Sequence, residues 1–288
     1  MSNPVWSERQ GPGGVAIPVA ELWGQAPGPT WLLTGAVHGD EYEGPEAIRR
    51  TVRELAGAAF PGRVIALPVV NPMAYRAGVR LTPSDQGNLN RLFPGDPTGT
   101  QTQRWADWIW QTFVTRADRL IDLHAGGVCF EFDPVAGFYE DADAPLAAVF
   151  GFTLWRAPRT PGVFSHEFRT RRGSSLGIEL GFGGTRDELL TDHAHRVLVR
   201  LVRGEAAPIT FPVFRNHDVT APDGGEWISH CRRGQQVAVG DVLGEMNTLD
   251  GSLLGRVLSP VAGRVLATRR ILSAMKGDLL VCIGVPEW

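Results

Sequence analysis

A chain of 288 residues exceeds the usual length of one domain, and its 43% hydrophobic and 20% charged residues are typical of a folded protein with a sizeable core. Its 28 basic and 31 acidic side chains give a formal net charge of -3 without a long run of one sign, which argues against nucleic acid as a partner. No segment approaches the roughly 20 apolar residues of a membrane span, and the first residues lack a secretion-signal pattern, so we expect no membrane association and a cytoplasmic location.

The first two thirds of the chain alternate β-branched runs with helical patterns, which predicts an α/β fold with a mixed, largely parallel sheet flanked by helices. Buried strands are predicted over residues 31–37, 63–70, 119–123 and 175–180. The predicted helices are one with Pro45 in its first turn that ends near Gly57, one along the apolar face of Trp105, Ile109 and Phe113, and one from about 186 to 202. Residues 71–99 form a long polar segment rich in Pro and Gly, and such loops are usually functional.

Beyond residue 208 no helical pattern remains, and short strands alternate with Gly-Asp and Pro-containing turns. We therefore divide the chain into an α/β domain over 1–207 and a small all-β, barrel-like domain over 208–288. A strand-turn pattern occurs twice in the second domain and resembles biotinyl and lipoyl carrier domains. The hairpin tip at 247–252, where those carriers bear a modified lysine, contains none, and Lys276 lies at a later turn, so no carrier role is expected.

Three side chains at the ends of two predicted strands have the character of a catalytic metal site. His38 and Glu41 follow the first strand at a spacing that lets one turn direct both at an ion, and His124 follows the third strand. An HxxE pair alone is more often a solvated turn, but here the same sheet edge supplies a second histidine. Two His and one Glu leave the fourth zinc position free for water.

Five motifs occur in the order seen in the succinylglutamate desuccinylase and aspartoacylase family: AVHGDEYEG, NPMAYRAGVR, NLNRLFPG, IDLHAG and GIELG. The chain resembles members of this family that carry a β-barrel C-terminal domain. The resemblance implies a zinc carboxypeptidase-like fold with one zinc ion per chain. It also implies the zinc ligands His38, Glu41 and His124, the catalytic carboxylate Glu179, the carbonyl-polarising Arg80, and a clamp for the substrate carboxylate made by Asn90 and Arg91.

Each implied role has a physical basis in the residue type. Zinc lowers the pKa of a bound water toward about 7, and Glu179 can take the water's proton and later pass it to the leaving amine. Arg80 offers positive charge to the oxygen that becomes negative in the tetrahedral intermediate, an effect on the order of 3 kcal/mol for one donor. Arg91 can bind a carboxylate through two hydrogen bonds, and Asn90 adds a further donor.

Three further residues are left open as site members. Arg76 is a near neighbour of Arg80 and an alternative to it. Asp122 either orients His124 or is a buried acid bonded to the backbone. Arg169 lies where relatives with an acidic acyl group carry a second carboxylate-binding arginine, although basic residues there are more often a solvated loop.

The resemblance implies hydrolysis of the amide bond of a small N-acyl amino acid, which releases a carboxylic acid and a free amino acid. Two departures from the family pattern indicate a different pocket rim: Asn88 replaces the usual acid before LNR, and the glycines after the catalytic Glu are interrupted in ELGFGG. Neither position is a predicted ligand, so we still expect amide hydrolysis. The identities of the acyl group and of the amino acid are left undetermined. An N-acetyl amino acid is one candidate, because barrel-bearing relatives include deacetylases of N-acetylated diaminobutyrate. A homodimer is also compatible, since similar enzymes are often dimers.

Two other functions are compatible with these residues. A zinc metallocarboxypeptidase acting on short peptides uses the same metal ligands and clamp. However, the gap between Glu41 and His124 is shorter than is typical of such enzymes, and the barrel could restrict entry to small substrates. A non-catalytic binding protein could retain the fold, but every expected catalytic position is filled. Stoichiometric metal separates both enzymes from the binding protein.

Overall fold

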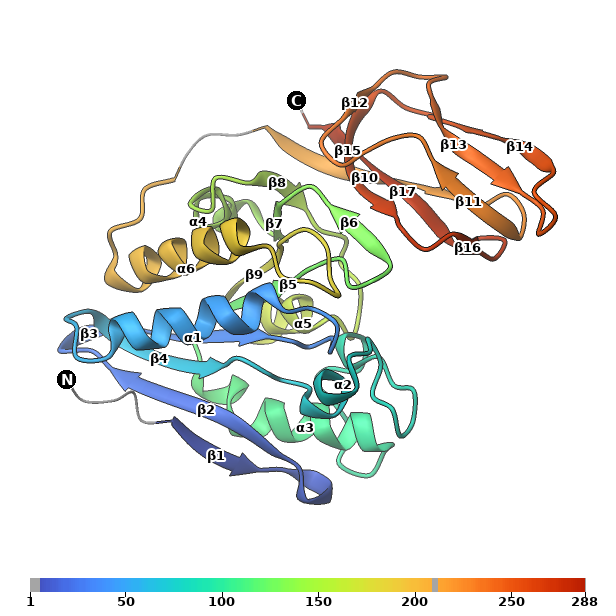
Figure 1. The fold of residues 1–288 in the computed structure, drawn as a ribbon. Coiled ribbons are helices and arrows are strands. Elements are labelled where there is room, and N and C mark those ends of the chain that lie inside the picture. The colour runs from blue at the N-terminus through green and yellow to red at the C-terminus, as the bar shows by residue number, and fades with distance from the viewer. Residues whose placement is uncertain (1–5, 209–211, 288) are drawn as a thin grey trace.

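The computed structural model describes residues 6–208 and 212–287. Its first part is a layered α/β structure in which a twisted sheet lies between helices, and its second part is a β domain beside one end of that sheet (Figure 1). The predicted fold class is confirmed. None of the described helices has the length and apolar character that a bilayer crossing requires.

The first part contains nine strands and six α-helices within the described residues. The strands are β1 (Trp6–Gln10), β2 (Ala16–Trp23), β3 (Ala26–Gly35), β4 (Pro61–Leu67), β5 (Arg119–His124), β6 (Phe130–Phe132), β7 (Val135–Phe138), β8 (Thr153–Arg156) and β9 (Ser174–Glu179). The helices are α1 (Glu43–Leu55), α2 (Pro72–Ala77), α3 (Gln101–Thr112), α4 (Ala144–Ala148), α5 (Phe164–Arg171) and α6 (Glu188–Arg203), with a short 3-10 helix η2 at Leu89–Arg91.

The centre of the sheet is parallel and its flanks are mixed. Strands β4, β3, β5 and β9 run parallel in that spatial order, whereas β1, β2 and β7 pair antiparallel with their neighbours on the inner side. All four predicted strands of this region are present as β3, β4, β5 and β9. The segment 71–99, predicted as a loop, contains α2 and η2, whose short lengths leave little helical periodicity to detect.

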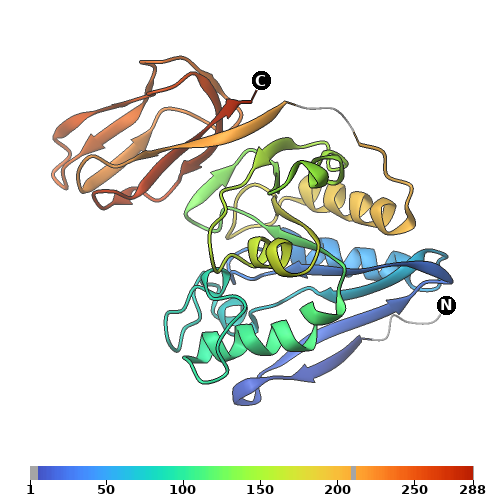
Figure 2. The same ribbon diagram turned by 180° about the vertical axis from the view of Figure 1, so that it is seen from behind.

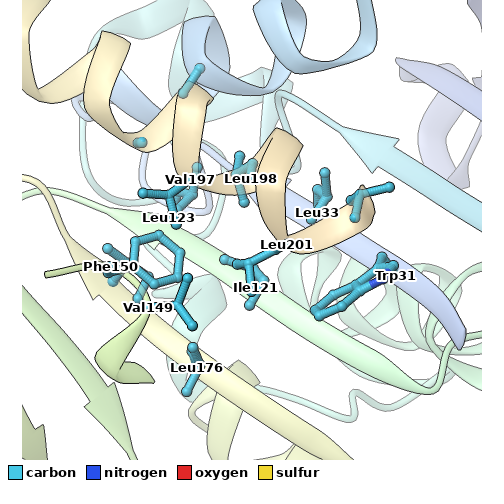
Figure 3. Packing of buried hydrophobic residues seen from close by; sticks show 14 of the residues in the cluster. Trp31, Leu33, Ile121, Leu123, Val149, Phe150, Leu176, Val197, Leu198 and Leu201 are labelled. Carbon is cyan, nitrogen blue, oxygen red and sulfur yellow. The ribbon is translucent and has the colours of Figure 1, made fainter. Parts of the chain in front are cut away.

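Successive side chains of the central strands point to opposite faces of the sheet, so the core has two parts, one on each face. Leu33 packs in a cluster with α1 and α6, whereas its neighbour Leu32 packs in a cluster with α3 and α5 on the opposite face. Figure 1 shows α1 and α6 in front of the sheet, and Figure 2, seen from behind, shows α3 and α5. Figure 3 shows the first cluster, where Leu33 and Ile121 of the sheet lie against Leu198 and Leu201 of α6.

The flanking helices begin and end at side chains suited to those positions. Thr100 and Gln103 form a reciprocal capping box at the start of α3. Asp187 accepts hydrogen bonds from the backbone at the start of α6, and Gly204 ends that helix in the left-handed conformation. These local interactions fix where α3 and α6 begin and where α6 ends.

The second part is built from two small sheets around its own core. Its strands are β10 (Val213–Thr220), β11 (Gly225–Ser229), β12 (Gln236–Val237), β13 (Val242–Asn247), β14 (Leu253–Leu258), β15 (Gly263–Arg269), β16 (Ser273–Ala274) and β17 (Leu279–Pro286). One sheet has the order β14-β13-β11-β16; the other, made of β10, β17, β15 and β12, is the end of the large sheet that continues from β8. Trp227, Leu243 and Ile283 are buried between them. The repeated strand-turn pattern corresponds to β12–β13 and β16–β17, and Lys276 lies in the second of these turns.

The two parts of the chain share one hydrogen-bonded sheet. Strand β10 pairs in parallel with β8, and β15 pairs antiparallel with β6. Arg264 of β15 also binds Asp133 between β6 and β7 at 2.7 Å. The predicted boundary at 207/208 falls between α6 and β10, in a connection whose residues 209–211 lie outside the described residues. The division into two domains therefore stays a prediction.

Truncation of a core side chain should measure how much the packing of α1 and α6 against the sheet contributes to stability. Leu33→Ala is expected to lower the free energy of unfolding by about 2–5 kcal/mol, because Leu33 is fully buried and its loss leaves a cavity. Denaturant titration followed by circular dichroism measures the change. The control Leu249→Ala, at a side chain 88% exposed, should change stability little. A Leu33→Ala loss as small as that of the control would contradict this packing.

Candidate active site

The three predicted metal ligands meet at one edge of the central sheet. His38 and Glu41 lie in the turn between β3 and α1, and His124 is the last residue of β5. The register places Gly35 opposite Leu123, so the chain leaves both strands at the same level. Each residue offers one ligand atom, and these atoms all lie within 4.8 Å of one another.

The Glu41 carboxylate joins the two imidazoles. Its Oε1 lies 2.9 Å from Nδ1 of His38, and its Oε2 lies 2.9 Å from Nδ1 of His124. All three side chains are at most 5% exposed. Burial alone would raise the pKa of Glu41, but the two neighbouring imidazoles outweigh it and lower that pKa. Two imidazole nitrogens and one carboxylate oxygen, buried and convergent, form a donor set that fits zinc.

A second layer of side chains holds the outward nitrogen of each imidazole. Asp122 Oδ2 lies 2.8 Å from Nε2 of His124, and Thr34 donates a hydrogen bond of 2.6 Å to the other Asp122 oxygen. Asn88 Oδ1 lies 3.2 Å from Nε2 of His38. Burial lowers the pKa of His38, whereas for His124 the charges of Asp122 and Glu41 outweigh burial and raise the pKa well above its usual value.

These contacts answer one open question and correct one expectation. Asp122 contacts the imidazole of His124 and the hydroxyl of Thr34, as an orienting residue would. Asn88 was interpreted as a change at the pocket rim, but it lies against His38. Its amide oxygen still supplies an acceptor to the imidazole, which explains how an amide can stand where the family pattern has an acid.

Gly39, between the two ligands of the HGDE turn, is required by a close approach of α2. A Cβ at this position would lie 2.0 Å from the carbonyl carbon of Ala74. The Gly39 N–H donates a hydrogen bond of 3.0 Å to the carbonyl of Val79. The turn is therefore packed tightly between β3 and the α2 segment, which fixes the positions of His38 and Glu41.

Glu179 ends β9 directly beside His38, Glu41 and His124, which we call the metal-ligand cluster after their predicted role. In the parallel register of β5 and β9, His124 and Glu179 are paired residues. The Glu179 side chain lines the cavity in front of the cluster, and its buried Oε2 has no hydrogen-bond partner among the described residues. Burial raises the pKa of Glu179 to about 8. A carboxyl in this setting can both accept and release a proton near neutral pH.

Arg80 and the two predicted clamp residues, Asn90 and Arg91, line the same cavity. Arg80 Nη1 donates a hydrogen bond of 3.2 Å to Oε1 of Glu41. Arg76, the alternative, is exposed and does not line the cavity. Arg91 Nη1 donates a hydrogen bond of 2.7 Å to the backbone carbonyl of Asn90.

The amide of Asn90 has structural partners of its own. Its Oδ1 accepts a hydrogen bond of 2.8 Å from the backbone N–H of Phe164, at the start of α5. Its Nδ2 lies 3.4 Å from Nε2 of His124. Asn90 thus links η2, α5 and the metal-ligand cluster, in addition to facing the cavity.

The cavity in front of these residues has a volume of about 310 Å³ and a largely apolar wall. The apolar wall includes Phe130, Phe132, Trp155, Ala157, Pro158 and Val163. Tyr139 and Ser165 also line it and share a hydrogen bond of 2.9 Å, and burial raises the pKa of Tyr139 to about 12. Arg169 does not line the cavity and instead binds Asp143 at 2.6 Å.

Several residues that line the cavity could not be identified from the sequence. Tyr139 and Trp155 lie on β7 and β8 or beside them, in strands of four residues that are too short for a clear alternation. Asn216, Asp218, Leu279 and Cys282 come from the barrel-like part, and only tertiary packing brings them to the cavity.

Comparison with known proteins places this site in a family. The family model described as the succinylglutamate desuccinylase/aspartoacylase catalytic domain matches residues 27–203. The chain is 38% identical over 195 residues to the N-alpha-acetyl-L-2,4-diaminobutyric acid deacetylase of Halomonas elongata. This match covers 64% of this chain and 57% of that protein. It is 34% identical over 118 residues to the succinylglutamate desuccinylase of Pseudomonas paraeruginosa, covering 38% and 35%. The matches thus span little more than half of the first relative and about a third of the second.

Solved structures match over the whole chain. The product-bound structure of the ectoine utilization protein EutE (DoeB) from Ruegeria pomeroyi has a TM-score of 0.81 at 30% identity, and the match covers 99% of this chain and 100% of that one. A succinylglutamate desuccinylase from Silicibacter sp. TM1040 has a TM-score of 0.81 at 26% identity, with full coverage of both chains. The catalytic-domain match and these full-length structural matches show that the chain belongs to the succinylglutamate desuccinylase/aspartoacylase family.

Proposed function

We propose that this protein hydrolyses the amide bond of a small N-acyl amino acid, releasing a carboxylic acid and a free amino acid, with one zinc ion held by His38, Glu41 and His124. The observation that carries the proposal is the position of Glu179. Its buried Oε2, which has no hydrogen-bond partner within the described part of the chain, stands beside three convergent zinc-type ligands in a cavity of about 310 Å³. The deacetylase and desuccinylase named among the relatives support amide hydrolysis.

Glu179 performs the proton transfers in this proposal. His38, Glu41 and His124 would hold the zinc ion, which would act as a Lewis acid and lower the pKa of water at the site. Glu179 Oε2 accepts a proton from the attacking water and delivers it to the leaving nitrogen, so one carboxyl serves both steps. Its raised pKa of about 8 suits a group that must hold a proton between the two transfers.

Arginines supply the positive charge that the substrate and the transition state need. Arg80 lies against Glu41 and lines the cavity, where it can stabilise the oxygen of the amide as that oxygen becomes negative. Arg91 lines the cavity without a salt bridge to any described acidic side chain, so its guanidinium is available for the substrate carboxylate. The side-chain amide of Asn90 offers the substrate a further polar contact beside Arg91.

The cavity favours a small, uncharged acyl group. Its wall is largely apolar, and Arg169, the candidate partner of an acidic acyl group, is bound to Asp143. The barrel-like part closes one side of the cavity with residues of β10 and β17, which supports an acyl amino acid over a peptide chain. Zinc as the working metal, the cytoplasmic location and a homodimer remain our expectations.

Replacing the proposed proton-transfer group should abolish turnover without removing the metal. Zinc-loaded wild type is expected to release free amino acid from members of a panel of N-acetyl, N-formyl and N-succinyl amino acids. Glu179→Gln should lower kcat at least 100-fold, because an amide cannot accept the proton. Zinc content, measured by elemental analysis, should stay at one ion per chain. Turnover of short peptides alone would favour the carboxypeptidase, and a chain that binds no stoichiometric zinc would favour the binding protein.

Removing the Asp122 carboxylate, which contacts the imidazole of His124, should weaken metal binding. Asp122→Asn is expected to lower zinc affinity about 10- to 100-fold, because the carboxylate orients the imidazole and increases its basicity. Competition with a chromophoric chelator measures the affinity. Asp223→Asn, at an exposed acid of the barrel-like part that does not line the cavity, is the matched control. An Asp122→Asn affinity equal to that of this control would rule out the orienting role.

The structural and substrate-binding roles of Asn90 can be separated. Asn90→Ala leaves the buried Phe164 N–H without its acceptor, so the free energy of unfolding should fall by about 1–3 kcal/mol. Asn90→Asp keeps an oxygen at this place and should lose less stability, while its negative charge raises KM for a carboxylate substrate. Denaturant titration and steady-state kinetics measure the two effects. Equal stability of Asn90→Ala and wild type would show that the hydrogen bond to Phe164 is unimportant.

A further inference from the structure

Strand β6 forms part of the cavity wall shortly after a predicted metal ligand. His124 ends β5, and β6 begins at Phe130. Phe130 and Phe132 both line the cavity, together with Ala125 and Gly126 of the connection between the two strands. The position of β6 therefore decides the shape of the space in front of the metal-ligand cluster.

Backbone hydrogen bonds hold β6 on both of its edges. On one edge it pairs antiparallel with β15 of the barrel-like part, its only strand partner within the described ranges 6–208 and 212–287. On the other edge the Phe132 N–H donates a hydrogen bond of 3.0 Å to the carbonyl of Gly181, in the loop after β9. Figure 1 shows β6 at the junction of the two parts. A strand of only three residues makes few backbone hydrogen bonds, so side-chain contacts matter for its position.

Glu131 lies on the face of β6 that points away from the cavity. Successive side chains of a strand point to opposite faces, so Phe130 and Phe132 share the cavity face and Glu131 has the other. The Glu131 side chain is 24% exposed and lies between two arginines of the barrel-like part. Its Oε1 lies 3.3 Å from Nε of Arg233, and its Oε2 accepts a hydrogen bond of 3.1 Å from Nη1 of Arg270.

Both arginines also contact the segments around the cavity directly. Arg233 Nη1 donates a hydrogen bond of 3.1 Å to the backbone carbonyl of Phe132. The Arg270 guanidinium lies 5.7 Å from the ring centroid of Phe182, in the loop after β9. Among the residues that the structure describes, Glu131 is the only acidic side chain that forms a salt bridge with either arginine. Glu131 therefore balances two positive charges that the barrel-like part places against the loops after β5 and β9.

This ion-pair network is expected to act on β6 rather than on the whole fold. Partly exposed ion pairs contribute little to the free energy of unfolding, which depends on the buried clusters. A short segment held by few contacts can, however, open locally while the core stays folded. Without the Glu131 carboxylate, the two guanidiniums would repel each other and no longer attract β6.

We propose that Glu131 is a positioning residue for substrate binding. Through Arg233 and Arg270 the barrel-like part holds β6, so that Phe130 and Phe132 form the apolar wall against which a substrate packs. The candidate catalytic residues lie on other segments, so Glu131 acts on binding of the substrate rather than on the chemical step. This inference goes beyond the proposed deacylase function, and its kinetic test rests on that function.

Hydrogen exchange measures how firmly β6 is held without any substrate. In Glu131→Gln, which keeps the shape of the side chain and removes its charge, the segment 126–134 should exchange roughly three- to tenfold faster, because two partly exposed ion pairs are lost. Glu245→Gln is the matched control. Glu245 is 26% exposed, forms a salt bridge with Arg256 of the neighbouring strand β14 and does not line the cavity. It should leave the exchange of this segment unchanged.

Steady-state kinetics separates a role in substrate binding from a general loss of structure. With the acyl amino acid of the panel that wild type turns over fastest, Glu131→Gln should raise KM roughly three- to tenfold and change kcat less than about twofold. The double variant Arg233→Gln/Arg270→Gln should raise KM at least as much, and adding Glu131→Gln to it should raise KM no further. Zinc content, measured by elemental analysis, should be equal in all variants.

The outcomes for Glu131 and for the deacylase function are distinguishable. Unchanged exchange of 126–134 in Glu131→Gln, an unchanged KM despite faster exchange, or a further rise of KM in the triple variant would overturn the role of Glu131. A fall of kcat with loss of zinc would also overturn it, because the variant would then disturb the metal-ligand cluster. Failure of wild type to release amino acid from any acyl compound would instead overturn the proposed function. Hydrogen exchange would still decide whether Glu131 holds β6 in that case, because it does not depend on turnover.

Discussion

The parallel register of three central strands is the constraint on which the site depends. Gly35 of β3 is paired with Leu123 of β5, and His124 of β5 is paired with Glu179 of β9. The chain therefore leaves these strands at one level, where the carboxyl ends of parallel strands form a ligand-binding edge. A slip of one residue in β5 would turn His124 to the opposite face of the sheet. The hydrophobic clusters on both faces oppose such a slip.

Burial gives the side chains at this edge their chemistry. Glu41 stays ionised because two imidazoles flank it, whereas Glu179 has a raised pKa because burial is not offset to the same degree. Two carboxylates close to each other thus have pKa values pushed apart, a pattern that separates a metal ligand from a proton-transfer group. Asp122 and Asn88 contact the outward nitrogens of the two imidazoles, so contacts within the chain orient both rings.

The barrel-like part completes the cavity because it is joined to the sheet rather than attached by a linker alone. Backbone pairing of β8 with β10 and of β6 with β15, together with the Arg264–Asp133 salt bridge, fixes its orientation. The candidate catalytic residues come from the first part, and residues of β10 and β17 in the second part line the same cavity.

Local sequence determined the strands, the long helices and the chemical identity of the site residues. His38, Glu41, His124 and Glu179 could be recognised because each follows or ends a strongly apolar strand and because their motifs occur in a family order. Only the tertiary structure decided which neighbours they have. Asn88 lies against His38 and Asp218 lies in the cavity wall through contacts that join residues distant in the chain. Periodicity reports which face of an element is buried, but it does not report what that face meets, and so these partners lay beyond sequence reasoning.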